Sequence, residues 1–214
     1  KGTVPTKYVT RDEYIDAVKN LQACGIDVYA DIVLNHRMGA DETEAIQAVK
    51  VNQENRTETV SDPKTIEAWT KFTFPGRNGQ YSDFIWDHTC FNGVDYDELK
   101  DKSAIYKFKG VQWNHGVDRE NVNYDYLMGA NVDYSVPKVR EELTNWGQWY
   151  LDTTGVHGFR LDAVKHIQRD FFPEWLGKLR ANNHKELFAV GEYWNAEVDI
   201  LMDDALCFCQ HLRL

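Results

Sequence analysis

Hydrophobic positions in the first 36 residues predict one helix followed by one strand. Residues 10–13, Thr-Arg-Asp-Glu, have the form of a capping box, and apolar residues follow at helical spacing until Gly25. Residues 26–34 then form a short, mostly apolar run that is typical of a buried parallel strand. The run ends at Asn35-His36, so we expect these side chains at the strand's carboxyl end.

Between about Arg37 and Asn131 the pattern has no regular period. Short aromatic pieces alternate there with Asn, Asp and Gly. A structureless loop of this length is implausible in a compact domain, so we expect an inserted irregular subdomain.

Regular structure returns after Ser135. Pro137 fits the first turn of a helix, and four apolar positions in it form one buried stripe: Val139, Leu143, Trp146 and Tyr150. Three further elements follow: a strand at 156–161, a helix over about 167–181 and a strand at 187–191. This alternation of helices and strands predicts an α/β barrel, of which only three strands are visible.

The strand at 156–161 brings Arg160 and Asp162 to its carboxyl end. Residues two apart share one face of a strand, and a guanidinium beside a carboxylate favours its ionised form, as a nucleophile requires. Glu192 ends the next strand, about one strand-helix-strand repeat later, so it should neighbour Asp162. Two facing carboxylic acids in unlike environments are typical of a glycosidase.

Each of these residues has a simpler reading when taken alone. Asp162 could be a helix cap, Arg160 an ion pair inside a barrel, and Glu192 a solvated loop carboxylate. His36 could be a hydrogen-bonded structural histidine, and Lys165 and His166 an exposed helix start.

Composition indicates which binding partners and which cellular location to expect. The net charge is −10, which argues against nucleic acid or an anionic membrane as partner and suits neutral ligands or cations. No apolar run approaches the length of a membrane span. Four cysteines without zinc or disulfide spacing read as free thiols and favour a cytoplasmic over a secreted location: Cys24, Cys90, Cys207 and Cys209.

Three stretches together resemble the α-amylase family of glycoside hydrolases, in the pattern of the bacterial liquefying α-amylases. They are residues 31–36 (Asp-Ile-Val-Leu-Asn-His), 158–166 (Gly-Phe-Arg-Leu-Asp-Ala-Val-Lys-His) and 191–194 (Gly-Glu-Tyr-Trp). The resemblance implies an α/β fold, a partial (β/α)8 TIM barrel holding about strands 3 to 5, with an irregular β-rich domain B inserted after strand 3. The segments are barrel residues 1–36, domain B at 37–134, barrel residues 135–204 and an atypical tail at 205–214, which reads as a shifted reading frame or an artificial extension.

The resemblance also implies endo-hydrolysis of α-1,4-glucosidic bonds in starch or glycogen with retention of configuration. Asp162 would be the nucleophile, and Glu192 the general acid and then the base. Glu192 lies between Val190 and two aromatic residues, so we expect a raised pKa from desolvation. Substrate contacts are implied for Arg160, His36, Lys165, His166, Trp194 and Tyr193, although Trp194 and Tyr193 could equally serve packing.

In this family a calcium ion, Ca2+, lies between barrel and domain B. The matching positions are Asn35, Asp125, Asn131 and the carbonyl of His166. A further metal cluster of the liquefying enzymes would lose its carboxylates here, since Asn92, Asn114 and Ser135 stand at the matching positions and only Asp133 is kept. We therefore expect one calcium site and no second cluster.

The leading hypothesis is an α-amylase represented by part of its catalytic domain, inactive as residues 1–214 alone, because five barrel strands and the family's fourth signature are missing. Two alternatives stay open: a non-catalytic starch-binding or interaction protein, and a transglycosylase of the same family. Product length and oligomeric state are left undetermined.

Overall fold

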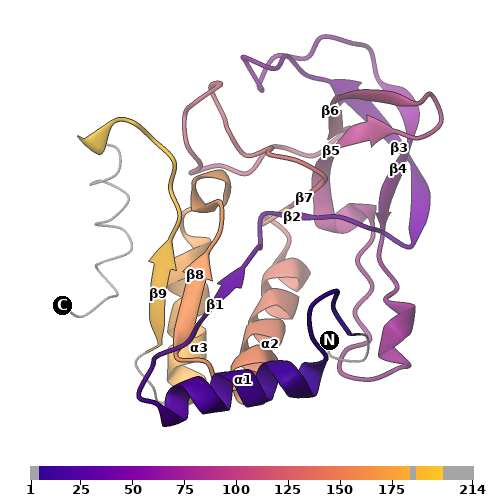
Figure 1. Ribbon diagram of the computed structural model, residues 1–214. Coiled ribbons are helices and arrows are strands. Elements are labelled where there is room, and N and C mark those ends of the chain that lie inside the picture. Colours follow the sequence, from indigo (N-terminus) through magenta and orange to yellow (C-terminus); the bar gives the residue numbers. More distant parts are fainter. Residues whose placement is uncertain (1–4, 184–186, 200–214) are drawn as a thin grey trace.

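The structure, a computed structural model, describes residues 5–183 and 187–199 and contains two sheets (Figure 1). In the first, three parallel strands lie in the order β1-β8-β9. Helices α2 and α3 cover one face of this sheet, and α1 lies at the end where the strands begin (Figure 1). The elements of this part are α1 (Arg11–Ala23), β1 (Tyr29–Ile32), α2 (Pro137–Thr154), β8 (Gly158–Leu161), α3 (Phe171–Asn183) and β9 (Phe188–Gly191). The alternating parallel arrangement confirms the expected partial α/β barrel.

Local signals in the sequence set the ends of these elements. Thr10 and Glu13 form the predicted reciprocal capping box, and Gly25 follows α1 with a positive φ of 76°. The strands are shorter than expected, because β1 pairs with β8 only between Tyr29 and Ile32. Helix α3 begins at Phe171 rather than near 167, because residues 164–166 form a 3-10 turn.

The two faces of the parallel sheet differ. On the helix side Phe159 is fully buried, with its ring centroid 5.4 Å from that of Trp175 on α3. On the opposite side Tyr29 and Phe188 stack with centroids 4.5 Å apart while each stays 43% exposed. Gly158 lies between them in the register, where a Cβ would come within 2.3 Å of the Phe188 carbonyl oxygen. Only glycine therefore fits at this strand position.

Residues 36–132 supply a second, antiparallel sheet of six strands in the order β2-β7-β5-β6-β3-β4. Its strands are β2 (His36–Arg37), β3 (Glu42–Lys50), β4 (Lys64–Lys71), β5 (Phe91–Asp97), β6 (Lys102–Phe108) and β7 (Ala130–Val132). The segment is β-rich as expected but more regular. In β4, Ile66, Ala68 and Thr70 are all fully buried at a period of two, a strand signal that the sequence reading missed.

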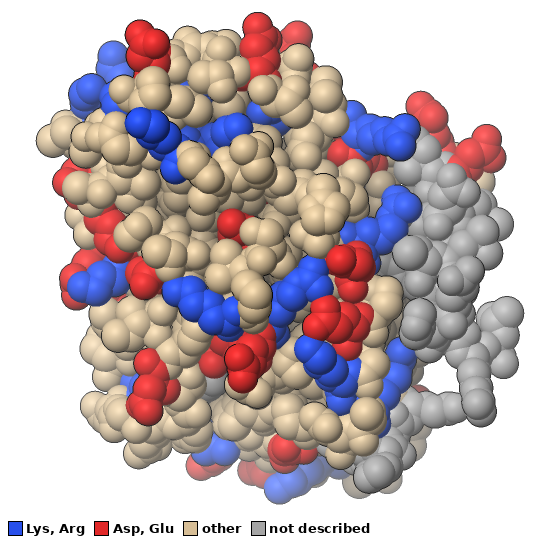
Figure 2. Space-filling view, turned by 180° about the vertical axis from the view of Figure 1, so that it is seen from behind, with Lys and Arg blue, Asp and Glu red and all other residues tan. Residues whose placement is uncertain are grey.

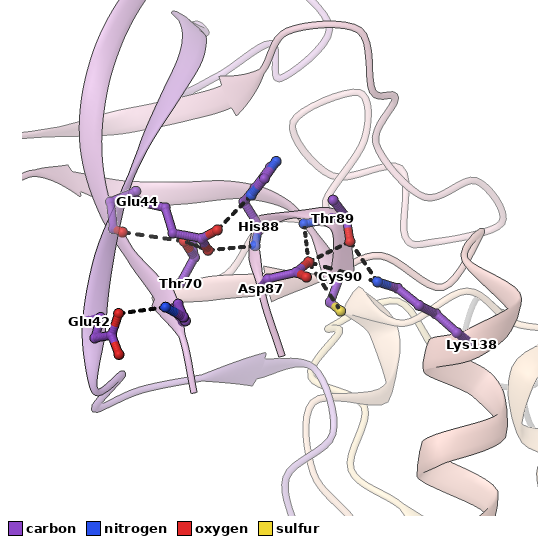
Figure 3. A network of polar contacts seen from close by, with 10 residues as sticks. Glu42, Glu44, Thr70, Asp87, His88, Thr89, Cys90 and Lys138 are labelled. Atoms are coloured by element: carbon purple, nitrogen blue, oxygen red, sulfur yellow. Dashed lines mark hydrogen bonds and ion pairs between the residues drawn. The ribbon is translucent and has the colours of Figure 1, made fainter. Parts of the chain in front are cut away.

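A polar network joins the second sheet to helix α2 (Figure 3). Lys138 at the start of α2 donates to the Thr89 hydroxyl at 2.7 Å, and the Thr89 amide donates to the Asp87 carboxylate at 2.9 Å. Next to it, Glu44 of β3 accepts hydrogen bonds from the backbone amide of His88 at 2.7 Å. The second sheet is thus tied to the barrel part through side chains as well as through the chain itself.

Charged side chains of both signs are interspersed on the molecule's surface, as Figure 2 shows for the back face. Arg140 on α2, for example, pairs with Asp170 at 2.8 Å and with Glu174. Among the helices of residues 5–183 and 187–199, none has the length and apolar character needed to cross a bilayer. Cys24 and Cys90 are free thiols, whereas Cys207, Cys209 and the 205–214 tail lie outside the described residues.

Candidate active site

Asp162 and Glu192 follow the last residues of two adjacent parallel strands. Leu161 of β8 is in register with Gly191 of β9, and the Glu192 amide donates to the Leu161 carbonyl at 2.8 Å. The Asp162 amide donates to the Ile32 carbonyl of β1 at 3.0 Å. The sheet ladder therefore holds both carboxylates at the carboxyl edge of the sheet, where parallel α/β folds place their ligands.

Arg160 connects the carboxylates of this edge. Its Nη1 donates to Asp162 at 2.7 Å and to Asp31 at 2.8 Å, and its Nη2 lies 2.8 Å from Glu192. The hydrogen bond that Arg160 donates to Asp31, and after it the bond to Asp162, raises the pKa of Arg160, so the guanidinium keeps its charge. Sequence reasoning missed Asp31, although its two-residue spacing from Tyr29 places it on the same face of β1.

The pKa of Glu192 is lowered, which corrects the expected increase. The largest cause is a hydrogen bond from the Trp194 indole Nε1 to the Glu192 Oε1, 2.5 Å long, and the Ala163 amide and Arg160 act in the same direction. The side chain is also 26% exposed, and desolvation, which raises the pKa, does not outweigh these contacts. The aromatic neighbour supplies an N–H donor to the carboxylate rather than an apolar wall.

Two histidines follow the carboxyl ends of β1 and β8. His36 begins β2 and is half-buried, and burial lowers its pKa although Asp162 and Asp95 act against this. His166 is buried, its Nδ1 lies 2.6 Å from the Tyr124 carbonyl oxygen, and burial lowers its pKa as well. Both rings are therefore suited to neutral hydrogen bonding near pH 7.

Lys165 is buried rather than at an exposed helix start. Its ammonium group donates to Glu120 at 2.7 Å and to the Trp194 carbonyl at 2.8 Å. Trp194 itself is 75% exposed. The Tyr193 hydroxyl donates to Asp118 at 2.6 Å. Asp118 and Glu120 had no recognisable signal in the sequence, because they lie in the irregular segment between β6 and β7.

The residues matched to a calcium site come together behind this edge. Asn35 donates through Nδ2 to the His166 carbonyl at 3.1 Å. Asp125 is fully buried, and this burial raises its pKa to about 6 although three asparagines donate hydrogen bonds to it. Asn131 Oδ1 is buried and has no hydrogen-bond partner among the described residues. These residues carry one carboxylate and three neutral oxygens, the ligand types of a hard cation, and of these oxygens Asn131 Oδ1 is the one left unpaired in the described part of the chain.

A second metal cluster does not fit the residues present. Asn92 and Asn114 turn N–H groups, not oxygens, toward Asp125 at 2.7 and 2.8 Å, and Ser135 donates its hydroxyl to Asp133 at 2.6 Å. Amide donors therefore occupy the place that a cluster of carboxylates and ions would need.

Sequence comparison agrees with this geometry. The family model described as "Alpha amylase, catalytic domain" matches residues 2–209, a span that reaches into the tail. An α-amylase of Geobacillus stearothermophilus is 50% identical over 203 residues, one of Bacillus licheniformis 47% over 201, and a cytoplasmic α-amylase of Escherichia coli 45% over 205. The chain therefore belongs to the α-amylase catalytic-domain family.

These alignments cover 94% of this chain but only 37%, 39% and 41% of the three relatives. Solved structures show the same fold at low identity. An Anoxybacillus α-amylase is matched with a TM-score of 0.54 at 15% identity, over 92% of this chain and 32% of that one. A Geobacillus thermoleovorans α-amylase complexed with acarbose is matched with a TM-score of 0.52 at 16% identity, over 92% and 32%.

Proposed function

We propose that this chain provides the catalytic edge of an α-amylase that hydrolyses internal α-1,4-glucosidic bonds with retention of configuration. The observation that carries the proposal is the pair Asp162 and Glu192, which end adjacent parallel strands and bind one guanidinium. Such a pair can supply a nucleophile and an acid that flank one scissile glycosidic bond. The α-amylases among the relatives support the substrate class.

In the first step, the Asp162 carboxylate attacks the anomeric carbon while Glu192 gives its proton to the leaving glycosidic oxygen. The C–O bond breaks, and a glycosyl ester forms on Asp162. In the second step, Glu192 takes a proton from water, and that water oxygen replaces Asp162 at the anomeric carbon. Arg160 holds the Asp162 carboxylate in place throughout through its hydrogen bond from Nη1.

Glu192 must carry a proton before the first step, yet Trp194 and Arg160 favour its ionised form. The substrate resolves this conflict. A glucan whose glycosidic oxygen reaches Glu192 displaces the indole N–H and excludes water, and both changes raise the pKa of the carboxyl group.

The remaining matched residues surround this pair. In both histidines Nδ1 faces an oxygen acceptor, Asn35 Oδ1 for His36 and the Tyr124 carbonyl for His166, so each neutral ring presents Nε2 as an acceptor for a sugar hydroxyl. The exposed Trp194 offers an apolar ring face. Lys165 and Tyr193 bind other groups of the protein in the structure, so we assign them a role in shaping the leaving-group side of the substrate site.

One calcium ion would be held by Asn35, Asp125, Asn131 and the His166 carbonyl. Bound there, the ion would supply positive charge beside the buried Asp125 and an oxygen-coordinated link between the two sheets. Asn131 Oδ1, which lacks a donor in the described part of the chain, supports this assignment.

The test uses the longest reading frame that contains residues 1–214. We expect release of reducing ends from soluble starch, with the first product in the α-configuration by NMR. A β-configured product would contradict retention. Starch binding without hydrolysis would favour the non-catalytic alternative, and newly formed longer glucans would favour transglycosylation.

A further inference from the structure

The loop that follows Glu192 is fastened by the segment between β6 and β7. Asp118 accepts the Tyr193 hydroxyl at 2.6 Å and the Asn195 side-chain amide at 3.3 Å. Residues 193 and 195 thus bind the same carboxylate oxygen, one on each side of Trp194. Asp118 is itself fixed, because its backbone amide donates to the Lys165 carbonyl at 2.9 Å and Tyr124 donates to its carbonyl at 3.0 Å.

A second tie holds the residue in between. The Lys165 ammonium donates to the Trp194 carbonyl at 2.8 Å and to the Glu120 carboxylate at 2.7 Å. Asp118 and Glu120 come from one loop, and the Glu120 amide donates to the Asp118 Oδ1 at 2.7 Å. Three consecutive residues after the acid are therefore held in place: Tyr193 and Asn195 by Asp118, and Trp194 by Lys165, which also binds Glu120.

The loop held in this way also contacts the acid directly, since the Trp194 indole donates to Glu192 Oε1. We propose that Asp118 is a positioning residue for Glu192, acting through Tyr193 and Asn195 to fix the loop that sets the orientation and hydrogen bonding of the acid. The proposal rests on the hydrolase function given above.

The charge of Asp118 suits this role. Its side chain is buried, which by itself raises the pKa, but hydrogen bonds from Tyr193, the Glu120 amide and Asn195 outweigh burial and leave the pKa lowered. Bonds to an ionised acceptor are about twice as strong as neutral ones, so the carboxylate holds the loop more firmly than an amide could. Asp118→Asn keeps the shape of the side chain and removes that difference.

The first experiment compares two leaving groups on one glucan chain. A sugar leaving group departs only when its glycosidic oxygen is protonated, whereas nitrophenol departs as the nitrophenolate anion. In the first step, only the first substrate therefore depends on a well-placed acid. For Asp118→Asn and Tyr193→Phe we expect kcat/KM, which reports the first step and not the later step in which Glu192 acts as base, to fall by ~10-fold or more with the sugar leaving group and by less than ~3-fold with nitrophenol. Glu197→Gln removes an exposed charge from the same loop and serves as the control, with both rates unchanged.

Equal losses on both substrates would show that Asp118 supports the fold or substrate binding in general and would overturn the proposal, as would no loss on either. All of these variants are made in the longest reading frame that contains residues 1–214, and failure of that wild-type protein on both substrates would instead refute the hydrolase function.

A second readout needs no turnover. The fluorescence of Trp194 is obtained as the difference between the spectra of the wild-type protein and Trp194→Phe. Its intensity should change with pH as Glu192 gains or loses its proton, and this transition should be absent in Glu192→Gln. Loosening the loop weakens the indole bond, so the midpoint in Asp118→Asn should lie at higher pH than in wild type. Identical midpoints in the two proteins would overturn the positioning role.

Discussion

Asp162 and Glu192 share one guanidinium: Arg160 reaches the first through Nη1 at 2.7 Å and the second through Nη2 at 2.8 Å. The strand register that aligns Leu161 with Gly191 makes this possible. A single planar cation thus fixes the relative placement of the proposed nucleophile and acid, which a flexible ammonium could not do.

Asp162→Asn and Glu192→Gln should each lower starch hydrolysis by at least ~10³-fold while starch binding changes little, because both groups act on the transition state. Steady-state rates and a starch pull-down measure the two effects. Asp16→Asn on the exposed face of α1 is the matched control. Near-normal turnover in either site variant would refute the assignment.

Trp194→Phe should move the alkaline limb of the pH profile of kcat/KM to higher pH. The indole bond lowers the pKa of Glu192, so its removal raises that pKa, and the acid stays protonated to higher pH. The phenyl ring keeps an apolar face for sugar. Rates measured from pH 4 to 9 test this, and an unchanged limb would show that the indole bond has no influence on the acid.

Calcium titration should find one site, and Asn131→Asp should tighten it by ~10-fold or more, because it adds a carboxylate at a buried oxygen without a described partner. Calorimetry on metal-stripped protein measures affinity and stoichiometry. Asn145→Asp on exposed α2 adds the same charge elsewhere and should change neither. Two or more tight wild-type sites would contradict the amide arrangement around Asp125.

Asn114→Ala should lower the free energy of unfolding by about 3 kcal/mol with or without calcium, since it leaves buried groups unpaired. The Asn114 side chain donates to Asp125 and Val132 and accepts from the Tyr134 amide. Denaturant unfolding in chelator and in calcium measures this, with Asn145→Ala as the exposed control. A loss that appears only after chelation would assign the stability to metal instead.

Residues 1–214 expressed by themselves should show no starch hydrolysis and should aggregate or unfold without a sharp transition. In the described structure the face of the parallel sheet opposite the helices leaves large apolar side chains 43–50% exposed: Tyr29, Val33, Phe188 and Val190. Solution mass and thermal scans measure the outcome. A monomer with cooperative unfolding and ordinary turnover would refute the argument.

The barrel part could be predicted because its signals are local. Thr10 and Glu13 mark a helix start, and the spacing of Asp162 from Glu192 reflects one strand-helix-strand repeat. The second sheet was predicted only as β-rich, since its pairs join residues far apart, such as Ile46 with Ile66, across irregular turns.

The protonation behaviour of the site could not be predicted from neighbours in the chain. Trp194 and Val190 suggested an apolar pocket for Glu192, but the direction of the indole N–H decides the sign of the pKa shift. Likewise, Asp118 reaches Tyr193 across 75 residues of sequence, so only the folded chain reveals the contact.

The pairing of β2 with β7 has a consequence for how this chain can change over evolutionary time. His36 and Asn131 are direct partners in that ladder, so the polypeptide leaves the barrel and returns to it at a single point. Genes tolerate insertions and deletions best where the flanking backbone ends meet. The segment between these two residues can therefore diverge, lengthen or shorten as a unit, with selection acting most strongly on the residues that contact the strand ends, such as Asp118 and Glu120.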